Sequence, residues 1–295
     1  MRKVKKNYTK KPFSLQPSGG PYKNALKRVI DAGRWGADAT SLYSSPSILI
    51  SLNDIYKNKC AYCEQTPLGS PLQVEHFRPK NGVDGIAHTG YYWLGYEWSN
   101  LLLSCGNCNS NKGNHFELLD EKNRIIAPIF KVNKEVDQDT FHILYKGLRD
   151  EKCLLINPEI DDPNLHFKYL TSGYINPTTD NGIESEKRYS LNRDELFVNG
   201  RQKIVNELTR KILKRIDLYK NGKPIREVLD SLILLIEEEI IENLEVDKPF
   251  CTFYKHMLLN HNSYFIDSIG EVKYRAAVKM AFNKSIKKLL QLNGI

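Results

Sequence analysis

The stretch that decides the fold runs from Lys59 to Phe116 and reads KCAYCEQTPLGSPLQVEHFRPKNGVDGIAHTGYYWLGYEWSNLLLSCGNCNSNKGNHF. It contains two Cys-x-x-Cys pairs, Cys60 with Cys63 and Cys105 with Cys108. Zn²⁺ prefers four tetrahedral ligands, and each such pair places two sulfurs at adjacent vertices. Four thiolates would fill every vertex, so the pattern predicts a structural zinc site worth about 10–16 kcal/mol of binding free energy. Four unrelated buried cysteines are the alternative.

The remaining composition is that of a globular protein with reduced cysteines. The two cysteines outside these pairs, Cys153 and Cys251, stand in apolar surroundings and are expected to be small buried hydrophobes. No apolar run reaches the roughly 18–20 residues that span a bilayer, and no apolar signal segment follows the basic N-terminus. We therefore expect a cytoplasmic protein whose cysteine pairs bind metal rather than form disulfides.

Positive charge is concentrated at the N-terminus. The net charge is +8, but residues 1–30 hold nine Lys or Arg and no acidic residue, so the rest of the chain sums to about −1 (8 − 9). Residues 1–20 also include a Pro/Ser/Gly stretch and are expected to form a basic disordered arm. Such an arm suits contact with phosphates, and a solvated tail that aids solubility is the other interpretation.

The elements around the cysteine pairs are expected in the order strand, long loop, strand, helix. Apolar residues at helical spacing first predict two helices, one at 21–33 with a proline in its first turn and one that begins after Ser45-Pro46. Strands are then expected at 73–77 and 101–103, followed by a helix from residue 106 to about Leu119. This order is the ββα arrangement of a small metal-dependent nuclease core. The predicted fold class is therefore α+β, with the zinc-stapled core at 21–120.

Beyond residue 120 the sequence predicts a mixed α/β extension at 121–200 and a helical C-terminal region at 201–295, a candidate surface for a partner. The strands are expected at 125–126, 154–158, 166–170 and 174–175. The helices are expected at 205–219, 225–243 and 276–292.

Polar residues between and beside the cysteines fit phosphodiester hydrolysis. That reaction needs a base to activate water and a cation to stabilise charge on the phosphorus centre and the leaving oxygen. His76 suits the first task because its ordinary pKa lies near neutral pH. Glu75, Asn100 and Asn109 are the other candidates. Consecutive strand side chains point to opposite faces, so Glu75 and His76 need a local bend to meet at one point.

The segment resembles a zinc-bearing HNH endonuclease, whose pattern runs Cys-x-x-Cys, acidic-His, Asn-Leu and Cys-x-x-Cys-(His/Asn)-x-x-Lys-Gly. The resemblance implies that His76 is the general base and that Asn100 orients it. It further implies that Glu75 and Asn109 coordinate a catalytic Mg²⁺ or similar divalent cation. Two positions depart from the commonest pattern, because Glu75 replaces Asp and Asn109 replaces His. His115 is a rival for the role of Asn109.

The wider chain resembles a narrower family, the HNH subunit of Septu-type antiphage systems, including retron-associated forms. The blocks that carry this likeness are Met1–Lys6, Val74–Lys80, Asn157–Phe167, and Leu191–Leu196 with Arg201, so it covers residues 1 to about 202. It implies that the nuclease works with an ABC-type ATPase subunit to restrict phage growth. In retron-associated forms it also implies a reverse transcriptase and its DNA as partners.

The neighbouring basic and aromatic residues have two interpretations each. Arg78, Lys80 and Lys112 are candidate phosphate-binding residues or ordinary surface residues. An aromatic cluster is expected to pack over the zinc core rather than to stack on unpaired bases. Its members are Tyr91, Tyr92, Trp93, Tyr96 and Trp98. His88 is expected to be a solvated loop histidine.

Three hypotheses follow for function. The leading one is a metal-dependent HNH endonuclease that acts as the effector of an antiphage complex. The alternative is a non-catalytic, zinc-dependent nucleic-acid-binding subunit, which would bind in a salt-sensitive way without cleaving. A third is a nuclease that is silent without its partner and docks through residues 201–295.

Overall fold

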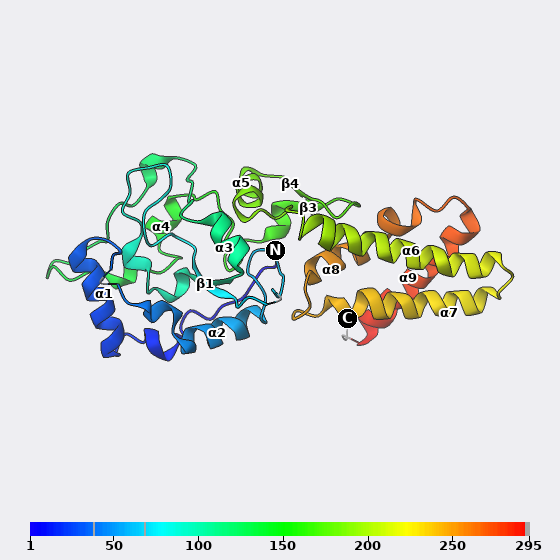
Figure 1. Ribbon diagram of the computed structural model, residues 1–295, viewed down its shortest axis with the longest axis horizontal. Helices are drawn as coiled ribbons and strands as arrows, with labels where there is room; N and C mark the ends of the chain where they lie inside the picture. Colours follow the sequence, from blue (N-terminus) through cyan, green and yellow to red (C-terminus); the bar gives the residue numbers. More distant parts are fainter. Residues whose placement is uncertain (38, 68, 293–295) are drawn as a thin grey trace. The chain divides into compact units, whose positions relative to one another are not determined.

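The computed structural model describes residues 1–37, 39–67 and 69–292, which divide into two compact units. The first unit joins Met1–Phe167 to Pro177–Ser190, and the second joins Lys168–Asn176 to Leu191–Ile295. Figure 1 shows short helices, loops and short strands in the first unit and longer helices in the second. The predicted α+β class is confirmed.

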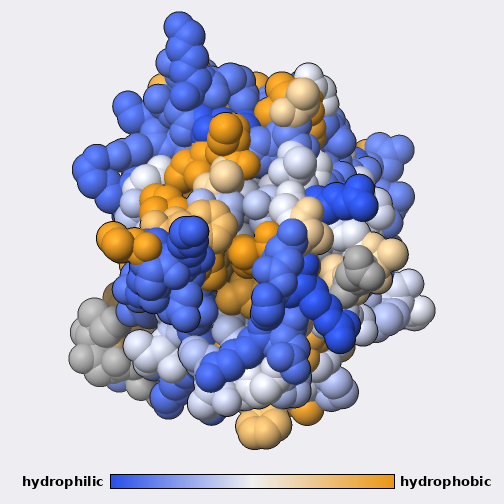
Figure 2. All heavy atoms as spheres, turned by 90° about the vertical axis from the view of Figure 1, so that its left-hand side faces the viewer, coloured by the Kyte–Doolittle hydropathy of each residue, from blue (hydrophilic) through white to orange (hydrophobic). Residues whose placement is uncertain are grey.

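The unit boundaries differ from the predicted domains. The segments predicted as a separate core and extension, 21–120 and 121–200, share one unit up to residue 190, apart from a short hairpin segment. The main part of the helical unit begins at Leu191, before the boundary predicted at residue 201. Within the described residues, no helix combines the length and apolarity that crossing a membrane would require. On the face of the molecule in Figure 2, hydrophilic residues predominate and hydrophobic ones gather in a recessed band.

The centre of the first unit has the predicted ββα order. Strand β1 (Gln73–His76) pairs antiparallel with β2 (Leu101–Ser104), and His76 lies opposite Leu101. All four residues of β2 are buried, which suits its run of three leucines, Leu101–Leu103. Helix α3 (Gly106–Lys112) follows directly. It ends well before the predicted Leu119, because Gly113 takes a positive φ of 51° that terminates the helix.

Two predicted N-terminal helices are present. Helix α1 (Gly20–Ala32) has a proline in its first turn and ends at Gly33, whose φ of 61° is left-handed. Helix α2 (Pro46–Tyr56) buries Ile48, Leu52 and Tyr56 and leads the chain to the first cysteine pair. The helical spacing of apolar residues was sufficient to predict both.

The basic N-terminal arm is not disordered, contrary to the prediction. Val4 is buried, and its backbone N–H donates to the Pro158 carbonyl at 2.8 Å. The Lys6 ammonium donates to the carbonyls of Trp98 (2.7 Å) and Leu101 (2.5 Å). It also pairs with Glu159 at 3.3 Å and lies 3.8 Å from the centre of the Trp98 ring. Part of the positive charge therefore stabilises the fold and is not available to phosphates.

The middle of the chain is less regular than predicted. No strand forms at 125–126, where Ile126 is exposed, or at 154–158. There the backbone is satisfied by other partners, since Ile156 N donates to the Ser185 hydroxyl at 2.8 Å. Two helices that the sequence did not predict are present, α4 (Lys146–Asp150) and α5 (Asp180–Tyr189). The predicted hairpin is confirmed as β3 (Phe167–Tyr169) and β4 (Ile175–Pro177).

The second unit contains the three predicted helices and one more. They are α6 (Lys203–Lys220), α7 (Ile225–Ile236), α8 (Cys251–Leu259) and α9 (Val272–Leu292), of which α8 was not predicted. Short π-helical turns lie at Phe197–Gln202, Glu237–Ile241 and Asn262–Ile266.

Short 3-10 turns occur in both units. They lie at Phe13–Leu15, Ser41–Ser44, Tyr92–Leu94, Trp98–Asn100, Glu121–Asn123, Gln138–Thr140, Pro163–Leu165 and Glu242–Leu244.

The buried Lys6 gives a stability prediction. Lys6→Ala leaves Glu159 buried without this cation, so the free energy of unfolding of the first unit should fall by about 3 kcal/mol. All three tryptophans (Trp35, Trp93 and Trp98) lie in this unit, so urea unfolding followed by tryptophan fluorescence reports on it selectively. The exposed neighbour is the control, and Lys5→Ala should change the value by about 0.5 kcal/mol at most. Equal effects of the two substitutions would contradict the assigned role.

Candidate active site and metal centre

The four paired cysteines meet at one point. The Sγ atoms of Cys60, Cys63, Cys105 and Cys108 all lie within 4.8 Å of one another, and all four residues are buried. The Cys63 and Cys105 sulfurs are 3.8 Å apart, which matches the edge of about 3.8 Å expected for a tetrahedron with Zn–S bonds of about 2.3 Å. The donor set and its size therefore fit a tetrahedral zinc ion with no open position.

Backbone contacts hold the first cysteine pair against the sheet. Ala61 N donates to the Leu103 carbonyl at 2.8 Å, which ties the turn to β2. Helix α5 closes the other side, since the Tyr189 ring stacks on Tyr62 with centroids 3.8 Å apart. The Cys108 thiol also lies 3.6 Å from the Tyr189 carbonyl. The metal centre thus joins segments that are distant in sequence.

His76 is oriented by a backbone carbonyl. Its Nε2 lies 2.9 Å from the Gly95 oxygen, and because a carbonyl only accepts, Nε2 carries the proton. Nδ1 is then the basic nitrogen, and the nearest cation to it is the Lys80 ammonium at 3.5 Å. The geometry leaves the imidazole ready to accept a proton at Nδ1.

Burial keeps His76 neutral. It lowers the pKa of the imidazole well below its usual value, and the positive charge of Lys80 acts in the same direction. The hydrogen bond to Gly95 opposes this shift, and the charge of Lys112 adds to it. A neutral imidazole is the form that a general base requires.

His76 opens onto a pocket of about 510 Å³. The polar residues that line it with His76 are Tyr43, Ser44, Gln73, Glu75, Lys80, Asn109 and Asn114. Glu75 and His76 thus line the same pocket although they are consecutive in β1. The pocket brings four of the predicted site residues together, His76, Glu75, Asn109 and Lys80.

Glu75 is buried beside a cation. Its Oε1 lies 2.6 Å from the Lys112 ammonium, which also donates to the His76 carbonyl at 3.0 Å. Burial raises the pKa of the Glu75 carboxyl, and the charge of Lys112 opposes that shift. The contact between Glu75 Oε1 and the Lys112 ammonium is an ion pair, and its angles are not those of a hydrogen bond. Oε1 therefore keeps a lone pair for another ligand. A buried carboxylate with spare acceptor capacity fits a site for a divalent cation.

Asn109 and His115 occupy different surroundings. The Asn109 amide donates to the Gln73 side chain at 2.9 Å, which leaves its own oxygen for another ligand, and it lines the His76 pocket. His115 lies 3.7 Å from Asp84 and 3.4 Å from Glu117, outside the set of residues lining that pocket. The geometry therefore favours Asn109 as the residue that shares a ligand with Glu75.

Asn100 does not touch the His76 ring. Its Oδ1 accepts from Arg78 N at 2.8 Å, and its Nδ2 donates to the carbonyls of Arg78 (3.0 Å) and Leu94 (3.2 Å). Leu94 precedes Gly95, whose carbonyl aligns the imidazole. Asn100 therefore contacts the backbone near His76, at Arg78, and the backbone next to Gly95, at Leu94, but not the imidazole itself.

Trp35 is a site residue that sequence reasoning missed. It packs so closely on Gly95 that a Cβ added there would lie 2.1 Å from the indole ring. The Tyr43 ring meets His76 edge-on, with centroids 4.7 Å apart, and the Tyr96 hydroxyl accepts from Thr40 N at 2.9 Å. The loop between α1 and α2 thus covers His76. Its sequence carries no recognised motif, so only the fold could reveal it.

Two of the three predicted phosphate-binding residues are not accessible. Arg78 is 3% exposed and pairs with Glu151 at 2.9 Å, and Lys112 is 0% exposed and pairs with Glu75. Neither can reach a substrate phosphate as placed, and this corrects the expectation. Lys80 remains, since it lines the His76 pocket and its ammonium lies 4.8 Å from the centre of the Tyr43 ring.

The aromatic cluster packs in the core, as expected. Tyr91, Tyr92, Trp93, Tyr96 and Trp98 are all buried. His88 does not line the His76 pocket and is not fully solvated. Its ring bonds the Ile125 carbonyl at 3.1 Å and accepts from Gly90 N at 3.0 Å.

Comparison with known proteins gives consistent matches. Residues 60–115 match the family model described as HNH endonuclease. The Septu protein PtuB of Bacillus mycoides (strain KBAB4) is 34% identical over 184 residues, which covers 59% of this chain and 56% of that protein. The Septu protein PtuB of Bacillus thuringiensis is 34% identical over 108 residues, 36% of this chain and 35% of that protein.

A third similarity is to a differently named protein of the same system. The Septu protein PtuA of Bacillus mycoides is 31% identical over 157 residues, 52% of this chain and 20% of that protein. The chain therefore spans little more than half, and in two cases much less, of the relatives that it matches. No solved structure is significantly similar to it.

The metal centre predicts that the first unit unfolds without its ion. Removing zinc with a strong chelator, or substituting Cys108→Ser, should abolish stoichiometric zinc binding and cooperative unfolding of this unit, because two strands of four residues have little stability of their own. Zinc content is measured by elemental analysis and unfolding by tryptophan fluorescence. Cys251→Ser, in the second unit, is the control and should keep the zinc. Unchanged unfolding of the zinc-free protein would contradict a structural ion.

The electrostatics of His76 predict the pH dependence of any cleavage. Since the folded pKa of His76 is lowered, the neutral base persists as pH falls through 6.5, and kcat/KM should decline only below that value. Lys80→Met removes one charge that lowers this pKa, so the acidic limb should move up toward 6.5. The exposed Lys122→Met is the control and should leave the limb in place. If the acidic limb of the kcat/KM profile of Lys80→Met lay at the same pH as that of the parent protein, or at a lower pH, this assignment would be contradicted.

Proposed function

Residues 60–115 of this chain form an HNH endonuclease domain, and from that premise we propose that the protein is a divalent-metal-dependent endonuclease that hydrolyses phosphodiester bonds of nucleic acid. The observation that carries the proposal is the state of His76. One ring nitrogen is fixed by the Gly95 carbonyl, the other lies 3.5 Å from the Lys80 ammonium, and the residue lines a pocket shared with Glu75 and Asn109. A merely binding module has no need of an oriented neutral base.

The residues of the pocket divide the chemistry among them. His76 Nδ1 takes a proton from water, and the hydroxide attacks phosphorus opposite the leaving oxygen. The Lys80 ammonium is placed to hold a non-bridging phosphate oxygen. The Gly95 carbonyl keeps its hydrogen bond to Nε2 when the ring becomes positively charged. The covering loop, with Trp35 and Tyr43, limits the access of bulk water.

We assign two metal sites with different tasks. The four cysteines hold Zn²⁺ as a structural ion. Glu75 and the Asn109 oxygen would hold Mg²⁺ or a similar hard cation, for which carboxylate and amide oxygens are suitable ligands. When bound, such a cation stabilises negative charge on the phosphorus centre and the leaving oxygen. Lys112 would keep the Glu75 carboxylate placed before the cation arrives.

The similarities support a role in antiphage defence. Relatives named Septu proteins PtuB and PtuA share about a third of their matched residues with this chain. We therefore propose that it is the nuclease subunit of a Septu-type system whose partner is an ABC-type ATPase. The helical second unit is the candidate surface for that partner. A retron reverse transcriptase as a further partner stays a prediction from the resemblance alone.

The test is cleavage by the whole chain, alone and with its neighbour-encoded partner. Labelled DNA and RNA are incubated with zinc-loaded protein in Mg²⁺ or EDTA, and cleavage should require Mg²⁺. His76→Ala should lower the rate by about 10²–10⁴-fold because the base is lost, with unchanged zinc content and melting temperature. Gln16→Ala, in the N-terminal arm away from the pocket, serves as control. Equal rates for His76→Ala and its parent would remove His76 from the mechanism, and salt-sensitive binding without cleavage, even with partner, would favour a non-catalytic subunit.

A further inference from the structure

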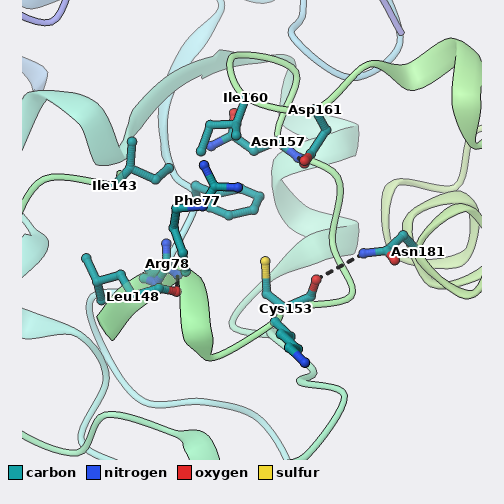
Figure 3. Close-up of a pocket in the computed structure, with 11 residues that line it drawn as sticks. Phe77, Arg78, Ile143, Leu148, Cys153, Asn157, Ile160, Asp161 and Asn181 are labelled. Atoms are coloured by element: carbon teal, nitrogen blue, oxygen red, sulfur yellow. Dashed lines mark hydrogen bonds between the residues drawn. The ribbon is translucent and has the colours of Figure 1, made fainter. Parts of the chain in front are cut away.

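A second cavity lies on the other side of the catalytic segment. Its volume is about 150 Å³, and it belongs wholly to the first unit. Its lining includes Phe77 and Arg78, the two residues that follow His76, and shares no residue with the His76 pocket (Figure 3). His76 thus lines one cavity, and Phe77, the next residue, lines the other.

One side of this cavity is apolar. Figure 3 shows Ile143 and Leu148 on one side of Phe77, with Ile160 above it. Phe77, Ile143 and Leu148 are almost completely buried. A cavity of about 150 Å³ is large enough for a single benzene-sized ring. Its apolar side therefore suits one flat six-membered ring.

Polar groups are gathered on the opposite side. Asn157 is 1% exposed, and its Nδ2 has no hydrogen-bond partner, although its Oδ1 accepts from Glu159 N at 2.9 Å. Asp161 stands beside it and accepts from Asn157 N at 2.8 Å. Buried amide donors are rarely left unpaired, so Asn157 indicates an acceptor supplied by a ligand. The carboxylate of Asp161 accepts hydrogen bonds, so the ligand should carry a hydrogen-bond donor next to its acceptor.

The rim of the cavity is positively charged. Arg149 and Lys152 are exposed, and within the ranges that the structure describes neither has an ion-pair partner. Arg78, by contrast, is neutralised by Glu151 at 2.9 Å. Two free cations beside an apolar slot suit a phosphate attached to a ring.

We propose that this cavity binds a nucleoside monophosphate with a single, amino-bearing ring, such as cytidine monophosphate. The ring lies among Phe77, Ile143 and Leu148. Its amino group donates to Asp161, and the adjacent ring nitrogen accepts from Asn157. The sugar lies at the rim, and the phosphate meets Arg149 and Lys152.

Such a ligand would act on the catalytic base through Arg78. This guanidinium holds the rim segment by two bonds, one to the Glu151 carboxylate (2.9 Å) and one to the Leu148 carbonyl (2.6 Å). The Arg78 backbone is in turn bonded to Asn100, which fixes the chain beside Gly95. A phosphate that draws in Arg149 and Lys152 therefore strains the backbone that aligns His76. This regulatory step rests on the proposed nuclease function.

Binding is tested separately from cleavage, by isothermal titration calorimetry on the zinc-loaded His76→Ala chain. Cytidine monophosphate should bind, and cytidine and inorganic phosphate should each bind at least tenfold more weakly. Uridine monophosphate, which presents an oxygen in place of the amino group, and adenosine monophosphate, which has a fused ring, should also bind at least tenfold more weakly. The double variant Arg149→Gln/Lys152→Gln should lose at least tenfold in affinity for cytidine monophosphate.

The matched control is Lys122→Gln/Lys187→Gln, which removes two exposed charges elsewhere on the same unit and should bind as the parent does. No binding of cytidine monophosphate, equal binding of phosphate or adenosine monophosphate, or equal loss in the control would overturn the assignment. In the active protein, cytidine monophosphate should change the cleavage rate severalfold, but not in the rim variant. A rate that does not respond overturns the regulatory step. Absence of all nuclease activity would instead count against the proposed function and leave the calorimetric result standing.

Discussion

The first unit depends on four thiolates brought to within reach of one ion. The two strands of its central sheet have only four residues each, and such a pair has little stability of its own. The cysteine pairs stand at either end of the segment that contains both strands, and Ala61 joins the first pair to β2. A bound ion therefore fixes the positions of β1, β2 and α3 together. Residues of β1, with Asn109 of α3, line the pocket of His76, so an ion at the cysteines would also support that pocket.

Buried cations provide a second kind of closure. Lys6, Arg78 and Lys112 each join segments far apart in sequence, through a carboxylate and one or more backbone carbonyls. In the second unit, the buried Arg201 donates to the carbonyls of Gly173 and Leu191 and to the Asn192 side-chain oxygen. Desolvating such charges is costly, and the complete set of partners is what makes it tolerable. If the cation of one pair is removed, its carboxylate partner stays buried without a compensating charge. Each of these ion pairs therefore requires both of its residues.

The active site extends beyond the segment that carries the motif. His76 lies in the motif, but the group that aligns it is the carbonyl of Gly95, and Gly95 is fixed by Trp35 on one side and by Asn100, through Leu94, on the other. The residue at position 95 has to be glycine because the indole occupies the place of any side chain. An HNH core is thus completed here by the loop between the two N-terminal helices. That loop is where a substrate entering the pocket would meet aromatic rings.

The sequence by itself determined the grouping of the four cysteines, the ββα order, both N-terminal helices and most of the second unit, because these depend on local spacing and periodicity. The same local signals overestimated α3 and proposed strands at 125–126 and 154–158, where backbone partners come from distant side chains. Charge was the least reliable guide. The sequence does not distinguish a surface lysine from a buried one. Only the tertiary structure showed that Lys80 lines the pocket and that Lys6 and Lys112 are buried. Periodicity is a property of neighbours along the chain, whereas burial and pairing depend on residues that folding brings together.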